Sequence, residues 1–208
     1  MDITNENSRH GTTTIGLVCT DGVILAADKR ASMGYMVASR TMEKILPITD
    51  KIAMTTAGLV GDAQMLAKYL RAEMELYEVR RQREVTLKAA GTMLANILFG
   101  QRPYSFYVQL LLAGSDPTGY HLYSLDPSGS LIEDKYTSTG SGSVFAFGVL
   151  EDKFKENMPL KEALTVVTRA LKAALARDIA TGDGMDIWLI NEKGIKKYTK
   201  DEIEKVLA

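Results

Sequence analysis

Segments with a strand pattern and segments with a helix pattern are grouped in separate blocks along this chain of 208 residues. The first block is predicted to form strands, because short runs of alternating or continuous apolar residues lie between turn sequences: 13–19, 23–28, 33–38, 44–47 and 51–57. Asp21-Gly22, between the first two runs, is a typical two-residue hairpin turn. Antiparallel pairing is therefore expected from the start of the chain.

Four helices are predicted from apolar residues that recur at i, i+3 and i+4. They cover 62–81, 87–98, 159–177 and 200–207. The remaining strands are predicted at 106–113, 120–125, 130–139, 185–191 and 195–198. Helices grouped between runs of antiparallel strands are typical of an α+β fold rather than of a series of βαβ units. Two sheets packed face to face, with helices covering both outer faces, would bury all the apolar stripes.

The charge balance argues against nucleic acid and membrane partners. Lys plus Arg number 25 and Asp plus Glu number 26, so the net charge is -1. No long basic run occurs, and no apolar run approaches the roughly 18 residues that a membrane span needs. Hydrophobic residues make up 46% of the chain and charged residues 25%, which is ordinary for a globular protein, and the length fits one domain.

Cysteine and histidine are too scarce for several kinds of catalytic or metal site. Cys19 is the only cysteine, and the strand pattern puts it on the same face as Ile15 and Leu17, so we expect it to be buried. A single cysteine excludes an internal disulfide and fits a cytoplasmic protein. With only His10 and His121, neither a Cys-His nucleophile nor a histidine metal site is expected, and we predict no cofactor.

Gly11 followed by Thr12-Thr13-Thr14 stands directly before the first predicted strand. A threonine hydroxyl is a weak nucleophile without a neighbouring base, and one such base is the residue's own α-amine. That arrangement requires a chain that begins at Thr12. We therefore expect cleavage after Gly11, with residues 1–11 as a removable propeptide and 12–208 as one catalytic domain. A disordered polar tail is the alternative for residues 1–11. Thr13 and Thr14 are assigned to the strand.

Other polar residues and glycines occur where an apolar pattern does not require them: Asp28, Lys44, Gly58, Ser141 and Asp178. Each also has a purely structural interpretation. Asp28 and Lys44 could form a surface ion pair that contributes little to stability. Gly58 could allow a strand to turn into a helix, and the sequence around Ser141 could be a flexible turn. Asp178 could be an ordinary residue at a helix end.

At these positions the chain resembles the proteasome β subunits, and most closely the archaeal type. The resemblance covers nearly the whole length from Thr12. Its motifs are Gly11-Thr12-Thr13-Thr14, Asp28 and Lys44 at the family's spacing, Ala57–Ala63, Ser124–Pro127, Gly140–Ser143 and Phe147–Glu151. Six motifs in order are highly specific. The resemblance implies a four-layer αββα sandwich of the N-terminal-nucleophile hydrolase type.

The resemblance also implies catalytic roles. Thr12 Oγ would attack the scissile carbonyl, and its free α-amine, with an ordinary pKa of about 7.7–8.0, would act as the base. Lys44 would stay cationic and favour the neutral amine, while Asp28 would hold Lys44 in place. Gly58 N–H would stabilise the oxyanion. Ser141 and Asp178 would form hydrogen bonds around the α-amine.

Position 181 departs from the family pattern, because Thr181 stands where many members have serine. The hydroxyl is kept, but the extra methyl stiffens χ1. By position, the resemblance places four residues in the primary substrate pocket: Ala31, Met42, Thr56 and Val60. Since none of them is charged, we expect a preference for apolar side chains, as in chymotrypsin.

The resemblance implies a threonine endopeptidase subunit of the 20S proteasome. Its partners would be copies of itself in two stacked heptameric β rings, rings of α subunits, indirectly a proteasomal ATPase, and unfolded polypeptide substrates. The main alternative is a non-catalytic structural subunit of the same ring, which the presence of Thr12, Asp28 and Lys44 disfavours. A simpler bacterial two-ring threonine protease and a small-amide hydrolase of the same class are further alternatives.

Overall fold

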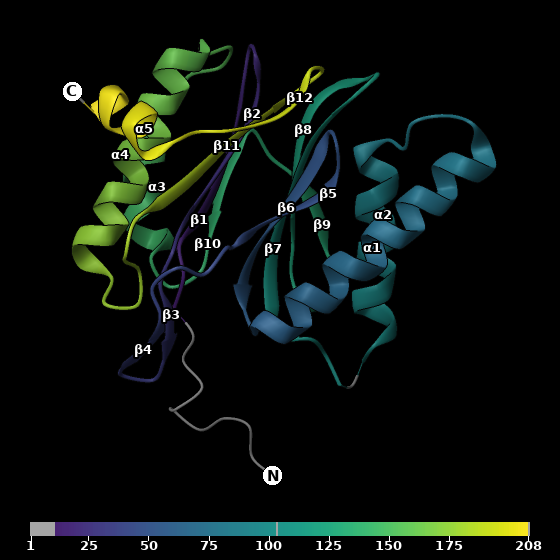
Figure 1. Ribbon diagram of the computed structural model, residues 1–208, viewed down its shortest axis with the longest axis horizontal. Coiled ribbons are helices and arrows are strands. Elements are labelled where there is room, and N and C mark those ends of the chain that lie inside the picture. Colours follow the sequence, from purple (N-terminus) through teal and green to yellow (C-terminus); the bar gives the residue numbers. More distant parts are fainter. Residues whose placement is uncertain (1–10, 103, 208) are drawn as a thin grey trace.

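The computed structural model describes residues 11–102 and 104–207, with the side chain of residue 207 left aside. Two antiparallel five-stranded sheets pack face to face, and helices cover the outer face of each sheet (Figure 1). The fold is thus the α+β, four-layer αββα sandwich predicted from the sequence. Residues 1–10 of the predicted propeptide, His10 included, lie outside the described residues.

The first sheet contains the strand that follows Thr12. Its spatial order is β10-β1-β2-β11-β12, and all neighbours are antiparallel. The strands are β1 (Thr14–Cys19), β2 (Gly22–Asp28), β10 (Tyr136–Thr139), β11 (Met185–Asn191) and β12 (Gly194–Lys197). The predicted hairpin of β1 and β2 is confirmed, but Cys19 pairs with Gly22, so its turn residues are Thr20 and Asp21, one position earlier than predicted.

The second sheet has the order β5-β6-β7-β8-β9. Its strands are β5 (Ile45–Thr49), β6 (Ile52–Gly58), β7 (Val108–Asp116), β8 (Gly119–Leu125) and β9 (Leu131–Glu133). A separate two-stranded hairpin, β3 (Ala31–Met33) and β4 (Met36–Ser39), connects the two sheets in the sequence and projects at one end of the molecule (Figure 1). A single strand over 33–38 was therefore the wrong prediction, because the turn at Gly34-Tyr35 divides it.

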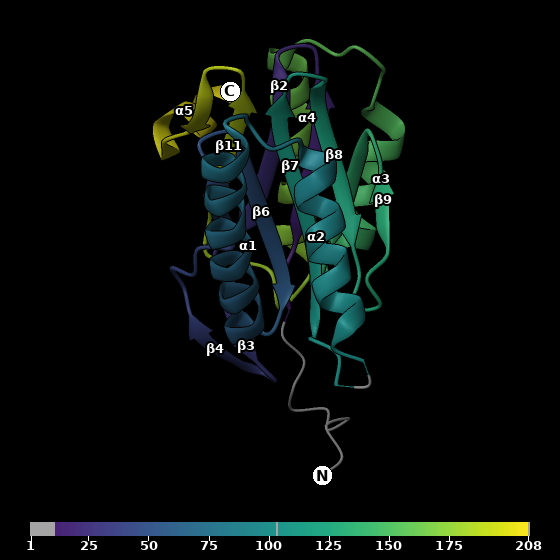
Figure 2. The same cartoon turned by 90° about the vertical axis from the view of Figure 1, so that its right-hand side faces the viewer.

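In the part of the chain that the structure describes, two helices cover the second sheet and three cover the first. α1 (Val60–Arg81) and α2 (Leu87–Gly100) lie side by side on the outer face of the second sheet (Figure 2). Thr86 caps α2 as predicted, since its hydroxyl accepts a hydrogen bond from Ala89 N at 3.3 Å. On the other side lie α3 (Ser143–Lys153), α4 (Leu160–Arg177) and α5 (Lys200–Leu207).

The core has one apolar layer in each of the three spaces between these four layers. The layer between the two sheets is built from alternate residues of the central strands, among them Val23 and Leu25 of β2 and Leu111 and Ala113 of β7. Cys19 is buried in the layer beneath α4 together with Ile15 and Leu17, as predicted. Within the described parts of the chain, no helix is both long enough and apolar enough to cross a membrane.

Two predictions for the middle of the chain were wrong. The segment 130–139 is two strands, because the chain leaves β9 in one sheet and enters β10 in the other. The helix α3 was not predicted, since it exposes Val144 and Phe145 and buries only Ala146 and Leu150, so no clean stripe marks it.

Candidate active site

Thr12 lies two residues before β1, at the end of the first sheet, and is only 5% exposed. Its backbone N–H donates to Ser141 Oγ at 3.2 Å. Its side-chain hydroxyl donates to the carbonyl oxygen of Gly11 at 2.7 Å. The hydroxyl therefore lies against the carbonyl group of the peptide bond that precedes it, which is the bond predicted to be cleaved.

Asp28, at the end of β2, connects the start of β1 to three other parts of the chain. Its Oδ1 accepts hydrogen bonds from Thr13 N at 3.0 Å and from Lys44 Nζ at 2.7 Å. Its Oδ2 accepts from Gly182 N at 2.9 Å and from Arg30 N at 3.1 Å. Four donors stabilise the carboxylate, and one oxygen joins the ammonium group of Lys44 to the residue after Thr12.

Lys44 and Asp28 form a buried ion pair and not a surface one. Their side chains are 4% and 0% exposed. Burial lowers the pKa of Lys44 from its ordinary 10.5, although the charge and the hydrogen bond of Asp28 act in the opposite direction. Desolvation is the larger effect, so the neutral amine of Lys44 is more accessible than that of a lysine in water.

A series of hydrogen bonds, most of them made by hydroxyl groups, connects Thr12 to the segment after α4. Ser141 Oγ, which accepts from Thr12 N, donates to Asp178 Oδ2 at 2.6 Å. The hydroxyl of Thr181 donates to the same oxygen at 2.5 Å. The hydroxyl of Thr181 also lies 2.7 Å from that of Thr13. The methyl group of Thr181 thus leaves room for both hydrogen bonds, and the three predicted residues 141, 178 and 181 lie together.

A second ion pair holds the loop 178–184 in place. Arg30 Nε donates to Asp183 Oδ2 at 2.7 Å, and Arg30 Nη1 donates to the carbonyl oxygen of Ile179 at 2.9 Å. Arg40 adds a contact with Asp183 Oδ1 at 2.8 Å. The guanidinium of Arg30 therefore connects the end of β2 with the loop that carries Asp178 and the backbone donor to Asp28.

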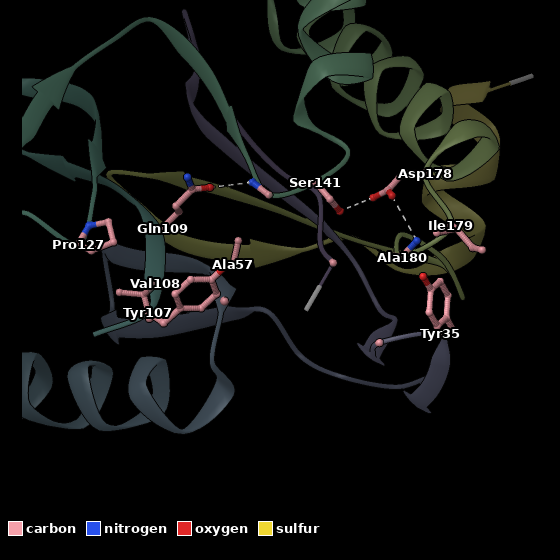
Figure 3. A pocket seen from close by; sticks show the side chains of 14 residues that line it. Tyr35, Ala57, Tyr107, Val108, Gln109, Pro127, Ser141, Asp178, Ile179 and Ala180 are labelled. Atoms are coloured by element: carbon pink, nitrogen blue, oxygen red, sulfur yellow. Dashed lines mark hydrogen bonds between the residues drawn. The ribbon is translucent and has the colours of Figure 1, made fainter. Parts of the chain in front are cut away.

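A cavity of about 580 Å³ opens beside these residues, between the ends of the two sheets (Figure 3). Gly11, Gly58 and Ser141 all line it. Gly58 has φ +118, and a Cβ there would lie 2.1 Å from the carbonyl oxygen of Tyr107, so only glycine fits. The other lining residues are Gly34, Tyr35, Ala57, Tyr107, Val108, Gln109, Pro127, Gly140, Asp178, Ile179 and Ala180.

The four predicted pocket residues do not line this cavity. Ala31 lies in β3, Met42 follows β4, Thr56 lies in β6 and Val60 is the first residue of α1. Thr56 N donates to the carbonyl oxygen of Lys44 at 3.0 Å, so at least this residue adjoins the ion pair. Their role as a specificity pocket stays a prediction.

Sequence reasoning missed several residues of this network. Thr13 was assigned to the strand alone, yet both its N–H and its hydroxyl are bound within the network. Gln109 Oε1 accepts from Gly140 N at 3.2 Å and so holds the loop of Ser141 from the opposite sheet (Figure 3). A glutamine inside the apolar run at the start of β7 was the signal available. Arg30 and the N–H of Gly182 carried no signal.

Two antiparallel sheets pack face to face, helices cover both outer faces, and a threonine precedes the first strand. This arrangement is the fold of the N-terminal-nucleophile hydrolase class. A family model described as proteasome subunit matches residues 8–190. The chain belongs to the proteasome subunit family, as a member of its β type.

Curated relatives match the chain over nearly its full length. A protein from Archaeoglobus fulgidus named proteasome subunit beta is 46% identical over 209 residues, which cover 100% of this chain and 98% of the relative. One of the same name from Ferroglobus placidus is 50% identical over 198 residues, covering 95% of this chain and 94% of the relative. One from Methanothermobacter thermautotrophicus is 46% identical over 202 residues, covering 97% and 96%.

Proposed function

We propose that this chain is a catalytic β subunit of the 20S proteasome core and a threonine endopeptidase that activates itself by cleavage between Gly11 and Thr12. The observation that carries the proposal is the 2.7 Å hydrogen bond from Thr12 Oγ to the carbonyl oxygen of Gly11. A buried ion pair and a chain of hydroxyl groups surround it. Family membership and relatives named proteasome subunit beta support the same function.

Self-cleavage begins with the attack of Thr12 Oγ on the carbonyl carbon of Gly11. At this stage Thr12 N is an amide and cannot accept the hydroxyl proton. Lys44 is proposed to take that proton, because Asp28 Oδ1 binds both Lys44 Nζ and Thr13 N and so holds the amine next to the residue after Thr12. Burial, which lowers the pKa of Lys44, favours the neutral amine. The C–N bond breaks as Lys44 passes that proton on to Thr12 N, which becomes an amine, and Gly11 remains attached to Oγ as an ester. Water then hydrolyses the ester, which releases a carboxylate at Gly11 and a free Thr12.

Substrate cleavage in the mature subunit repeats this chemistry with a different base. The free α-amine of Thr12, held by Ser141 and Asp178, accepts the hydroxyl proton and passes it to the leaving amine of the substrate. Lys44 in its charged form favours the neutral α-amine. The N–H of Gly58 stabilises the oxyanion of the tetrahedral intermediate, and such a donor typically contributes a factor of about 10²–10³ in rate.

The specificity pocket is proposed to consist of Ala31, Met42, Thr56 and Val60. Without a charged side chain, it favours large apolar residues on the acyl side of the cleaved bond. A panel of fluorogenic peptides tests this preference. Equal cleavage after acidic or basic residues would contradict it.

The subunit is proposed to act in the cytoplasm, in two stacked homo-heptameric β rings between rings of α subunits. Proteasomal ATPases would unfold polypeptides and deliver them to the interior. Enclosure of the active sites inside the rings protects folded proteins from cleavage. Because activity requires self-cleavage, the subunit stays inactive until it has assembled. A non-catalytic structural subunit of the ring is the alternative, but the intact set of Thr12, Asp28 and Lys44 favours catalysis.

Substitution of the nucleophile tests the proposed activity. Thr12→Ala should lower peptidase activity by a factor of at least about 10³, because no hydroxyl remains to attack. Thr12→Ser is the matched control, since it keeps the hydroxyl and should retain measurable activity. Both variants should assemble to the same particle mass. An assembled Thr12→Ala particle with normal peptidase activity would refute the proposal.

A further inference from the structure

The residue before the scissile bond is held by a side chain that the proposed mechanism does not use. Gly11 N donates a hydrogen bond to Ser32 Oγ at 3.0 Å, in a buried environment. Gly11 also presents its carbonyl oxygen to Thr12 Oγ at 2.7 Å. Because the N–H and the C=O of one residue are both bound, the orientation of the reacting carbonyl relative to the hydroxyl is fixed.

Ser32 reaches Gly11 through an irregularity in its strand. It lies in β3, where the pairing with β4 shifts register between Ala31 and Ser32. Such shifts redirect a side chain and are frequent beside active sites. Ser32 is only 6% exposed, whereas its neighbour Met33 is 56% exposed. The hairpin thus directs one small hydroxyl group inward, to the propeptide residue next to the cleaved bond.

Gly11 is confined on its other side as well. A Cβ built on Gly11 would lie 1.7 Å from Cβ of Ala180 and 3.0 Å from Ser141 Oγ. The residue before Thr12 therefore lies between Ser32 and the loop of Ala180, with no room for a side chain. A peptide substrate carries a side chain at the corresponding position. It must therefore bind with its backbone in a different place.

We propose that Ser32 is a positioning residue for self-cleavage and not for the hydrolysis of peptide substrates. This inference rests on the proposed function. By accepting a hydrogen bond from the N–H of Gly11, the Ser32 hydroxyl holds the carbonyl carbon of Gly11 in front of Thr12 Oγ. Once Gly11 has left, the hydroxyl has no further part in catalysis.

The test compares three variants of the full-length chain: Ser32→Ala, Ser32→Thr and, as a matched control, Ser39→Ala. Ser39 lies in β4 of the same hairpin, and its hydroxyl accepts from Thr41 N and not from Gly11. Each variant is assembled with its α-type partner, and intact mass follows the loss of residues 1–11 over time. Peptidase activity is then measured per mature subunit after conversion is complete.

Ser32→Ala should slow conversion by about three- to tenfold, the effect of one lost hydrogen bond. Ser32→Thr should restore the rate, Ser39→Ala should not change it, and all mature particles should have wild-type peptidase activity. Conversion of Ser32→Ala at the wild-type rate would overturn the inference, and so would a failure of threonine to restore the rate. If Ser32→Ala lowered the peptidase activity per mature subunit as much as it lowered the rate of conversion, the role of Ser32 would be merely structural and the inference would also be overturned. Failure of the wild-type chain to convert would instead refute the proposed function.

Discussion

Asp28 is the residue on which the geometry of the site depends most. Its two oxygens bind donors from four separate places: Thr13, Arg30, Lys44 and Gly182. The ammonium group of Lys44 has lost most of its hydration, and the carboxylate of Asp28 compensates for part of that loss. The result is a lysine that is held in one position and that releases its proton more easily than an exposed lysine.

Lys44→Arg separates the charge of this residue from its ability to accept a proton. Arginine keeps the positive charge beside Asp28, but its pKa lies well above that of lysine, which prevents it from acting as a base. Self-cleavage should therefore fall by at least about 10², the lower range for general base catalysis. Intact mass of the assembled particle measures it. Complete removal of residues 1–11 at the wild-type rate would contradict the proposed role of Lys44.

The pH dependence of self-cleavage follows from the lowered pKa of Lys44. Below that pKa the amine is protonated and inactive as a base, and its neutral fraction grows as the pH rises. The rate of conversion should therefore increase with pH and level off below pH 10.5, the ordinary lysine value. Time courses of intact mass at several pH values measure this profile. A rate that falls as the pH rises would exclude Lys44 as the base.

At the scale of secondary structure, the junction of β6 and α1 positions the backbone N–H that is proposed to stabilise the oxyanion. Gly58 ends β6 with φ +118, and its backbone lies against the carbonyl group of Tyr107. Leu59 N donates to that same carbonyl oxygen at 2.8 Å, so the turn into α1 is fixed. The position of the Gly58 N–H therefore depends on a turn that no other residue can adopt without strain.

Gly58→Ala should disrupt this junction. The new Cβ would lie 2.1 Å from a backbone oxygen, at a φ that alanine rarely adopts, and we expect a loss of at least about 2 kcal/mol in unfolding free energy and of most activity. Gly61→Ala is the control three residues on, in α1, where a Cβ has no neighbour within 4 Å. It should be neutral or slightly stabilising. Urea unfolding and peptidase assays measure both. Equal effects of the two substitutions would contradict the explanation.

Elements with one clean apolar stripe or a strong turn signal were predictable from the sequence. α1 and α4 were expected near their observed bounds, and the β1–β2 hairpin was expected from Asp21-Gly22. α3 was missed because its apolar residues lie on both of its faces. The division of 130–139 was missed because alternation has the same period in both sheets and does not reveal a crossing between them.

The candidate site was only partly predictable, for a similar reason. Residues that matched family motifs, such as Lys44 and Ser141, were found in sequence. Gln109 and Arg30 were not, because their contacts cross from one sheet or loop to another and leave no local pattern. A pattern of side chains in the sequence does not indicate which backbone N–H groups act as donors, such as that of Gly182. Three-dimensional structure was needed to find them.

At the scale of the whole molecule, the site exists only where both sheets and the loop 178–184 meet. Thr14 of β1 is hydrogen-bonded to Thr55 of β6 at 3.1 Å, and Gln109 of β7 holds Gly140 across the cavity. The apolar layer between the sheets fixes these contacts at a distance from the cavity. Correct packing of the two sheets therefore precedes any reaction at Gly11 and Thr12.

The intact mass of the β chain in the assembled, active particle is the most direct measurement of self-activation. The mass should equal that of residues 12–208, with a free amino group on Thr12. In a Thr12→Ala particle the chain should keep Met1 through Gly11. A wild-type particle whose chains all retain residues 1–11 and that still hydrolyses peptides would contradict the central claim, because Thr12 would then have no amine to act as its base.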